Sequence, residues 1–316
     1  MKDRKKIAVV AFGGNALLPE KQTGTFIQQQ LNADLFCEAI LDIVQNGYEL
    51  IIVHGNGPQV GNILVQVEED KATMIPGLPL DACVAATQGT IGYILINALR
   101  QACKRRKINK NVVAILTTVI VSLADAAFKH PEKPIGAFLT QERAIEMMKN
   151  KDWHIVEDSG RGYRRVVPSP KPKRILESGS IRKLVFDNNI VVAGGGGGIP
   201  VENKTGGLKG VEAVVDKDLV ASLLAREVGA DIFIIVTGVP KVAINFGKPD
   251  MRYLDTVTVR EAERYMEEGH FPPGSMGPKM EAALQFIKHG GKEVLITSAD
   301  EIKEALEQKT GTHIVA

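Results

Sequence analysis

Short apolar runs alternate with longer amphipathic stretches along most of the chain. The runs that predict strands are 7–12, 49–54, 112–121, 189–193, 232–236, 294–297 and 312–315. Apolar runs of this length are typical of strands buried on both faces of a parallel sheet. Helical spacing of apolar residues favours helices over about 28–46, 81–106, 216–228, 280–289 and about 301–308. This alternation predicts an α/β fold, a three-layer αβα sandwich around an open, mainly parallel sheet.

Residues 124–173 interrupt this pattern. They hold many of the prolines, the only tryptophan (Trp153) and little helical periodicity beyond 140–149. The proline-containing stretches 133–138 and 168–172 cannot belong to central strands, because proline donates no ladder hydrogen bond. We therefore predict one domain over residues 1–316, with a small protruding subdomain inserted at 124–173.

Several predicted strands end in glycine turns. The turns are 13–14, 55–57 and 194–198, and a fourth strand ends at Gly238. Ligands bind at the carboxyl ends of the strands in an open parallel sheet. Glycine lets backbone N–H groups come close to an anion there, and three such turns are hard to explain by turn geometry alone. We expect a phosphorylated ligand, held by several loops because neither a P-loop motif nor a G-x-G-x-x-G fingerprint is present.

A charge cluster follows the third glycine turn and the turn-rich segment 199–210. Asp216, Lys217 and Asp218 open a predicted helix, and Lys279 lies at another helix start. Lysines at such positions could neutralise a phosphoryl group in transfer, and the aspartates could orient Lys217 and hold Mg²⁺ or its waters. A helix cap is the alternative; it explains one aspartate well and the lysine between them poorly.

Composition excludes other classes of function. A net charge of +2 and few aromatic residues argue against nucleic-acid or membrane-surface binding. The basic run 104–107 is interpreted as a solvated helix end. Three widely spaced cysteines fit a reducing compartment and no structural metal site. No apolar run approaches the roughly 18 residues of a membrane span, and the first run is too short for a signal core, so we expect a soluble, cytoplasmic protein.

Eight motifs extend this picture from end to end of the chain. They are 11–16 (AFGGNA), 54–61 (HGNGPQVG), 133–136 (KPIG), 167–171 (VPSPK), 195–200 (GGGGIP), 212–218 (EAVVDKD), 245–250 (NFGKPD) and 273–279 (PGSMGPK). Together they resemble the carbamate kinases of the amino acid kinase family. The motifs at 133–136 and 167–171 separate carbamate kinases from other members of that family. The resemblance implies an amino acid kinase-like sandwich with a protruding subdomain and a homodimer. It also implies Mg²⁺-dependent interconversion of ATP and carbamate with ADP and carbamoyl phosphate. Because carbamoyl phosphate is a mixed anhydride, we expect the reaction to run toward ATP, in fermentative arginine catabolism.

The resemblance also implies the residues of the site. Those of the transfer step would be Lys133, Lys217, Asp218 and Lys279. Those around phosphate and carbamate would be Gly13, Gly14, Asn15, Gly55, Asn56, Gly57, Gly196 and Gly197. The nucleotide would contact Thr237, Gly238, Met276 and Lys279. No direct protein metal site is implied; Mg²⁺ would be carried by the nucleotide, with Asp216 or Asp218 within reach.

One departure from the family pattern lies at Pro240 and Lys241, where an acidic and an aromatic residue are expected. It leaves the adenine contacts open. Carbamate is already an anion and needs no general base, so His54 is interpreted as a strand-end residue. Two alternatives remain: another amino acid kinase acting on a larger carboxylate such as acetylglutamate, and a non-catalytic ligand sensor on the same scaffold.

Overall fold

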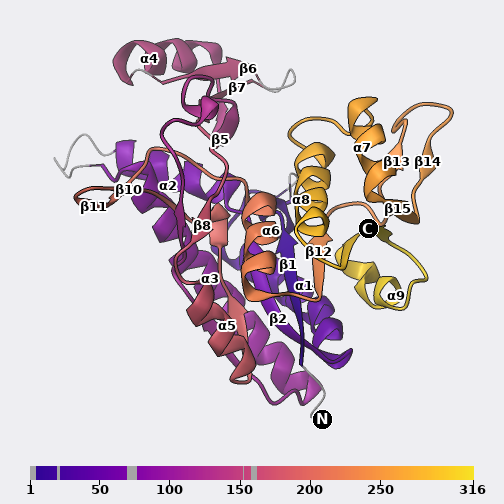
Figure 1. Cartoon of the computed structure of the whole chain (residues 1–316). Helices are drawn as coiled ribbons and strands as arrows, with labels where there is room; N and C mark the ends of the chain where they lie inside the picture. Colours follow the sequence, from indigo (N-terminus) through magenta and orange to yellow (C-terminus); the bar gives the residue numbers. More distant parts are fainter. Residues whose placement is uncertain (1–4, 20–21, 70–76, 152, 158–161) are drawn as a thin grey trace.

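The computed structural model of the protein describes residues 5–19, 22–69, 77–151, 153–157 and 162–316. Within them the main sheet has eight strands, in the order β15–β17–β16–β12–β1–β2–β9–β3 (Figure 1). Neighbouring strands run parallel except β16 and β17, which run antiparallel. The strands are Lys6–Phe12 (β1), Tyr48–His54 (β2), Asn111–Ala114 (β3), Asn189–Val192 (β9), Ile232–Val236 (β12), Thr256–Thr258 (β15), Glu293–Thr297 (β16) and Thr312–Val315 (β17). The predicted fold class is confirmed.

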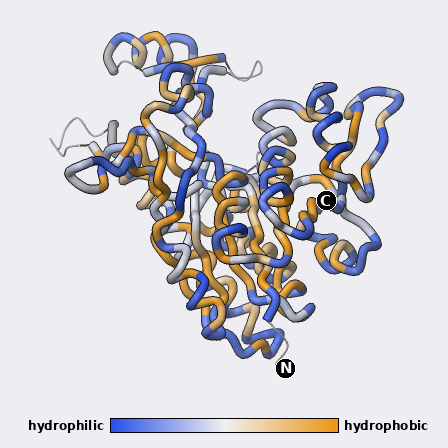
Figure 2. Tube along the Cα trace, viewed as in Figure 1, coloured by the Kyte–Doolittle hydropathy of each residue, from blue (hydrophilic) through white to orange (hydrophobic). Residues whose placement is uncertain are grey.

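Helices cover both faces of this sheet. Because side chains alternate along a strand, Val9 and Ala11 of β1 join one hydrophobic core, whereas Val10 and Phe12 join the other. The first core is completed by helices Ser178–Phe186 (α5), Lys217–Val228 (α6), Val259–Glu267 (α7) and Met276–Lys288 (α8). The second is completed by Phe26–Gln45 (α1), Leu80–Arg106 (α3) and Ile302–Leu306 (α9). Figure 2 shows the hydrophobic residues gathered along the central strands and the inner sides of the helices.

Helix α3 is long and apolar enough to cross a membrane, by length and composition alone. The expectation that no stretch would reach this length was therefore too strong. In the fold, α3 packs against α1 and β3 and buries residues along its whole length, from Leu80 to Cys103. It is a core helix of a soluble protein.

The predicted strand over 112–121 was wrong in one respect, because two short strands lie there. The first, β3, pairs with β9 at the edge of the main sheet, and the second, Thr118–Ile120 (β4), belongs to another sheet. Between them, the buried side chain of Gln88 accepts a hydrogen bond from the backbone N–H of Thr117 at 2.8 Å. The Gln88 side chain thus takes the place of a neighbouring strand as the hydrogen-bond partner of Thr117, where the chain passes from one sheet to the other.

Residues 199–210 were expected as turns but form a hairpin. Its strands, Ile199–Lys204 (β10) and Gly207–Gly210 (β11), are joined by Thr205 and Gly206. With β4 and Arg174–Ile175 (β8) they make a four-stranded sheet in the order β11–β10–β4–β8 among the described residues. A glycine-containing two-residue loop is a hairpin signal that the sequence carried.

Helix boundaries differ from the predictions at glycine and proline. Helix Gly57–Glu69 (α2), α5 and α7 were not predicted, although Thr258 and Glu261 form a capping box at the start of α7. Helix α8 begins at Met276 rather than at residue 280. Pro278 fits its first turn because an N–H is unpaired there in any case, and Lys279 therefore lies inside the helix.

Part of the 124–173 segment stands away from the main sheet, at the upper left of Figure 1. It contains strands Lys133–Leu139 (β5), Ile155–Glu157 (β6) and Tyr163–Val167 (β7), in the order β5–β7–β6, with helix Gln141–Lys151 (α4). Pro134 is on β5, at the edge of this small sheet, where a missing donor is tolerated. The single-domain description with a subdomain at 124–173 remains an interpretation of this arrangement.

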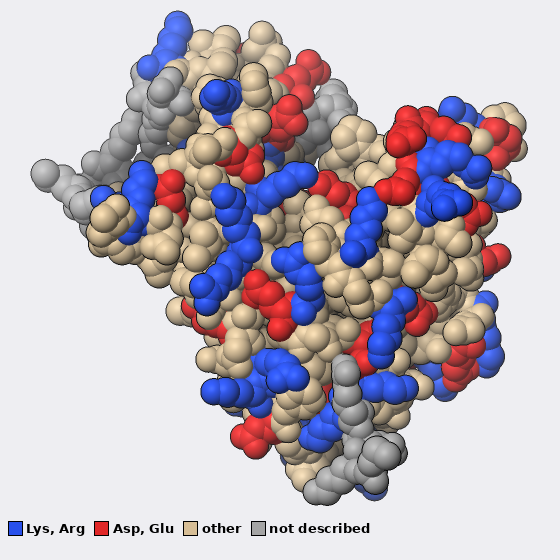
Figure 3. All heavy atoms as spheres, viewed as in Figure 1, with Lys and Arg blue, Asp and Glu red and all other residues tan. Residues whose placement is uncertain are grey.

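The remaining elements are short. Ala243–Ile244 (β13) and Arg252–Tyr253 (β14) form a two-stranded ribbon, and Ala126–Phe128 (η2) and Ala299–Glu301 (η4) are 3₁₀ turns. On the face drawn in Figure 3, lysine and arginine are interspersed with aspartate and glutamate. That face is hollowed between the protruding part and the lobe that holds α7, β13 and β14 (Figure 3).

Candidate functional site

The first two glycine turns lie against each other at the carboxyl ends of β1 and β2. The N–H of Gly55 donates to the carbonyl of Phe12 at 2.8 Å. A Cβ on Gly55 would lie 2.7 Å from the backbone N of Gly14 and 3.1 Å from Cδ of Lys217. Only glycine therefore fits at position 55, and its small size brings the 13–14 turn beside the Lys217 side chain. Asn15 follows in the short turn Gly14–Ala16 (η1), and its side chain lies outside the described part of the chain.

The third glycine turn closes over the second. Gly196 has φ 65°, and a Cβ there would lie 2.2 Å from the amide nitrogen of the buried Asn56 side chain. A Cβ on Gly197 would lie 2.1 Å from the carbonyl oxygen of Val215, the residue before Asp216. The turn Gly195–Gly197 (η3) is thus wedged between the loop after β2 and the start of α6. Gly57 begins α2 on the other side of Asn56.

Two side chains of α3 hold these loops, and sequence reasoning missed both. Gln88 donates to the carbonyl of Gly195 at 2.9 Å and to that of Thr117 at 3.1 Å. Asn56 donates its side-chain amide hydrogen bond to the hydroxyl of Thr87 at 2.8 Å. Thr87 and Gln88 are buried. Adjacent polar residues in an otherwise apolar helix were the available signal, because buried polar groups need partners.

Lysines from three segments converge on two aspartates at the start of α6. Asp218, only 2% exposed, pairs through Oδ1 with Lys217 Nζ at 2.7 Å and through Oδ2 with Lys279 Nζ at 3.4 Å. Asp216 pairs through Oδ2 with Lys133 Nζ at 2.6 Å. Its Oδ1 caps the helix by accepting from the N–H of Asp218 at 2.8 Å. Capping thus accounts for Asp216 and leaves Asp218 as the carboxylate between two lysines.

The electrostatics of this cluster favour an anion. Burial alone would raise the pKa of Asp216, but the charges of Lys133 and Lys217 hold it well below its usual range. Burial and the charge of Lys217 lower the pKa of Lys279, and the two aspartates oppose that effect. Three ammonium groups against two carboxylates leave an excess of positive charge beside the glycine turns. A phosphoryl group there would restore the balance.

His54 ends β2 behind the third glycine turn. Burial lowers its pKa to about 4, against the smaller opposing effect of a hydrogen bond with the carbonyl of Gly55. A Cβ on Gly195 would lie 2.2 Å from its Nε2. The ring is therefore neutral near pH 7 and packed against backbone, in keeping with a strand-end role rather than with general base catalysis.

The predicted nucleotide residues lie at the same edge of the sheet. Thr237 follows β12, where its N–H donates to the carbonyl of Thr297 at 2.9 Å, and exposed Gly238 comes next. Half-buried Met276 begins α8, one turn before Lys279. The unexpected Lys241 forms an ion pair with Asp255.

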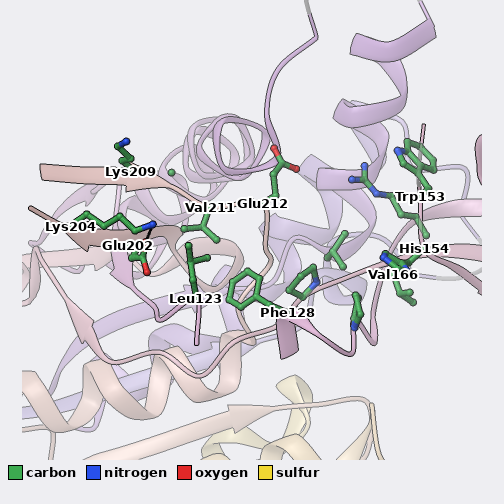
Figure 4. Close-up of a pocket in the computed structure, with 15 residues that line it drawn as sticks. Leu123, Phe128, Trp153, His154, Val166, Glu202, Lys204, Lys209, Val211 and Glu212 are labelled. Carbon is green, nitrogen blue, oxygen red and sulfur yellow. Dashed lines mark ion pairs between the residues drawn. The ribbon is translucent and has the colours of Figure 1, made fainter. Parts of the chain in front are cut away.

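A separate cavity of about 470 Å³ lies between the protruding part and the β10–β11 hairpin. Figure 4 shows Trp153 and His154 at one end and Glu202, Lys204 and Lys209 at the other. None of the predicted site residues lines this cavity. The lysine cluster, rather than this cavity, gathers the residues suited to phosphoryl transfer.

Comparison with known proteins places this geometry in a family. The model of the amino acid kinase family matches residues 6–298. The carbamate kinase of Thermococcus kodakarensis is 49% identical, over 98% of this chain and 99% of the relative. A carbamate kinase-like protein of Escherichia coli is 46% identical, over 98% and 99%. The structure of Giardia lamblia carbamate kinase bound to AMP-PNP superposes with a TM-score of 0.91 at 40% identity, covering 98% of both chains. The chain therefore belongs to the amino acid kinase family, in the branch of the carbamate kinases.

Proposed function

We propose that this protein transfers a phosphoryl group reversibly between ATP and carbamate, giving ADP and carbamoyl phosphate. The convergence of Lys133, Lys217 and Lys279 on Asp216 and Asp218, directly beside the glycine turns, is the observation that carries the proposal. Phosphoryl transfer needs a positioned donor, an in-line acceptor and neutralisation of the phosphoryl oxygens. The names of the relatives at 46–49% identity point to the same reaction.

The acceptor end suits a very small anion. Gly196 faces the loop Gly55–Gly57 so closely that a Cβ on it would meet the Asn56 side chain, and Gly197 beside it packs against the carbonyl of Val215. Carbamate would lie between these walls, with its charged oxygen aimed at the phosphorus. Because the attacking oxygen already carries negative charge, no base is needed, and the neutral His54 fits that requirement.

The transferring group would lie between the acceptor and the lysines. Backbone N–H groups of Gly13, Gly14 and Asn15 would donate to its oxygens, because Gly14 lies beside Gly55 and the Lys217 side chain. Lys217 would neutralise the charge in transfer, and Asp218 would hold Lys217 and Lys279 apart at fixed positions. The nucleotide would extend from there past Met276 toward Thr237 and Gly238.

Magnesium fits this site as a companion of the nucleotide. Each carboxylate of Asp216 and Asp218 already pairs with a lysine, and no group of three metal-ligating side chains is found among the described residues. A dication held by protein alone is therefore disfavoured. Asp216 or Asp218 could still orient waters of a Mg²⁺ ion bound by phosphate oxygens, which would add positive charge at those oxygens.

The physiological direction is proposed to be ATP formation, in fermentative arginine catabolism. Carbamoyl phosphate is a mixed anhydride, so its phosphoryl group is readily transferred to ADP. A cytoplasmic location is consistent with the three buried cysteines, Cys37, Cys83 and Cys103, none of which forms a disulfide.

A homodimer is also proposed. Ile27, Leu31 and Leu35 share one face of α1, because they recur every four residues, and they are 68%, 58% and 74% exposed. Tyr93 of the neighbouring α3 stacks on Phe26 beside them. An apolar face of this kind on two packed helices suits a second copy of the chain. Sedimentation equilibrium should give twice the chain mass, and a monomer at micromolar concentration would contradict the proposal.

The decisive experiment is ATP formation from ADP and carbamoyl phosphate with Mg²⁺. Turnover by the folded protein is expected, and its absence would remove the proposed function. Offering acetylglutamate with ATP in an ADP-release assay separates the nearest rival, which predicts phosphorylation of the larger acid. A non-catalytic sensor would bind nucleotide, as measured by calorimetry, and turn over neither substrate pair.

A further inference from the structure

A glycine–glycine contact joins the protruding part to helix α2. A Cβ built on Gly61 of α2 would lie 1.8 Å from Cα and 2.2 Å from N of Gly136 on β5. Real Cβ atoms essentially never come within 3.0 Å of heavy atoms outside their own residue and its two chain neighbours. Backbone is the obstacle here, so no side chain fits at Gly61 unless β5 moves more than an ångström away from α2.

This contact lies midway between two parts of the proposed site. Helix α2 begins at Gly57, in the acceptor loop, and Gly61 is four residues on, about 6 Å along the helix. Strand β5 begins at Lys133, and Gly136 is three residues on, about 10 Å along the strand. The acceptor loop and Lys133 are therefore connected through one close backbone crossing.

The start of β5 is docked rather than projecting. Ile135 is 1% exposed and shares a hydrophobic core with Val60 and Leu64 of α2. Lys133 Nζ then reaches Asp216 Oδ2 at 2.6 Å, with a third of its side chain still exposed. A small sideways movement of β5 at Gly136 would carry the Lys133 ammonium group away from Asp216.

We propose that Gly61 is a positioning residue for phosphoryl transfer. Its missing side chain lets β5 lie against α2 at the distance where Lys133 reaches both Asp216 and the acceptor pocket. The inference rests on the proposed function, because it assigns Gly61 an effect on turnover through Lys133. It also places Lys133 at the start of β5, the part of this strand that is docked on α2.

The test is Gly61→Ala, assayed with carbamoyl phosphate and ADP. Displacement of Lys133 by about 1 Å should lower kcat/KM for carbamoyl phosphate by about a hundredfold and leave the KM for ADP unchanged. In a Lys133→Ala background the same alanine should add less than about twofold, because residues acting through one group are not additive. If the loss in the double variant equals the product of the losses in Gly61→Ala and Lys133→Ala, the two residues act independently and the inference is overturned.

Two glycine controls separate position from stability. A Cβ on Gly136 would meet Gly61 Cα at an ordinary 3.5 Å, but φ is 76° there. Gly136→Ala should therefore lower Tm through backbone strain while affecting kcat/KM far less than Gly61→Ala. Gly89→Ala, exposed in the middle of α3 with no atom within 4 Å of its Cβ, should leave turnover unchanged.

The result remains decidable if Gly61→Ala does not fold. Ile135→Val removes one methylene from the core that docks β5, and should lower kcat/KM severalfold in the wild type but not in the Lys133→Ala background. An equal loss in both backgrounds would contradict the inference. An active wild type with an unaffected Gly61→Ala defeats the inference alone, whereas a wild type without turnover defeats the proposed function and the inference together.

Discussion

The acceptor end and the nucleotide end of the proposed site are built differently. At the acceptor end Asn56 and Gly196 are buried and in direct contact, and Gln88 fixes the turn from below. At the nucleotide end Gly238 is exposed and Met276 is half-buried. A carbamate ion offers few atoms, so it can be recognised only by close walls. A nucleotide offers many atoms, and its affinity can be spread over a more open surface.

Lys217 lies where the two ends meet, and its loss should have the largest effect. Lys217→Ala is expected to lower kcat by about two to three orders of magnitude, because a charge contact to the transition state disappears. The measurement is steady-state ATP formation. Lys104→Ala, at the exposed end of α3, is the matched control and should behave as wild type. An unchanged kcat would remove Lys217 from the transfer step.

The acceptor end should be intolerant of even one methyl group. Gly196→Ala would bring a Cβ within 2.2 Å of the Asn56 amide, at a φ of 65° that disfavours alanine. The KM for carbamoyl phosphate should rise by about 10- to 100-fold, while the KM for ADP stays constant. Gly206→Ala, at the hairpin tip with open space around its Cβ, is the control. Equal changes in both KM values would show that the ends are not separate.

Asp218 should govern the pH dependence of turnover. Burial and Lys217 lower the pKa of Lys279, and the Asp218 carboxylate counteracts them. Asp218→Asn removes that counteraction, so the pKa of Lys279 should fall further. The alkaline limb of the pH–activity profile, where Lys279 loses its proton, should therefore shift to lower pH. At neutral pH kcat should fall by about tenfold, through lost orientation of Lys217. If the alkaline limb of the Asp218→Asn profile lies at the same pH as that of the wild type, the protonation of Lys279 does not control turnover.

The open nucleotide end should give the smallest effect. Met276→Ala removes a half-buried side chain at the start of α8. The KM for ADP should rise by about fivefold, equivalent to ~1 kcal/mol of apolar contact, with kcat unchanged. Titration of ADP at saturating carbamoyl phosphate measures it. A larger effect on carbamoyl phosphate than on ADP would reverse the assignment of the two ends.

Most of the main sheet could be predicted because its strands are buried on both faces. The bounds of β12 and β17 match the predicted runs, and β1 and β2 differ by one residue. The failures lie where polar groups or glycines replace apolar periodicity. The break at Thr117 depends on Gln88, twenty-nine positions away, and the β10–β11 hairpin has too few apolar residues to show alternation.

The site was predictable to a different extent. Motifs indicated the lysines and the glycine turns, and the structure gathers them at one edge of the sheet; their individual roles stay predictions. The supporting contacts made by Thr87, Gln88 and Gly61 are present in the structure but were not predicted from the sequence. A positioning residue acts through its tertiary contacts. Contacts between residues far apart in the sequence depend on how the elements pack, and local sequence patterns do not predict that packing.

The place of β1 in the sheet has a consequence for how the chain folds during synthesis. Strand β1 pairs with β2 on one side, but its other partner, β12, begins at Ile232. More than two thirds of the chain must leave the ribosome before that apolar edge is covered. The half-sheet β1–β2–β9–β3 can assemble earlier, yet the edge of β1 that faces β12 stays unpaired until then. Nascent chains that stop before residue 232 should accordingly depend on chaperones more than chains that extend through β12 and β16.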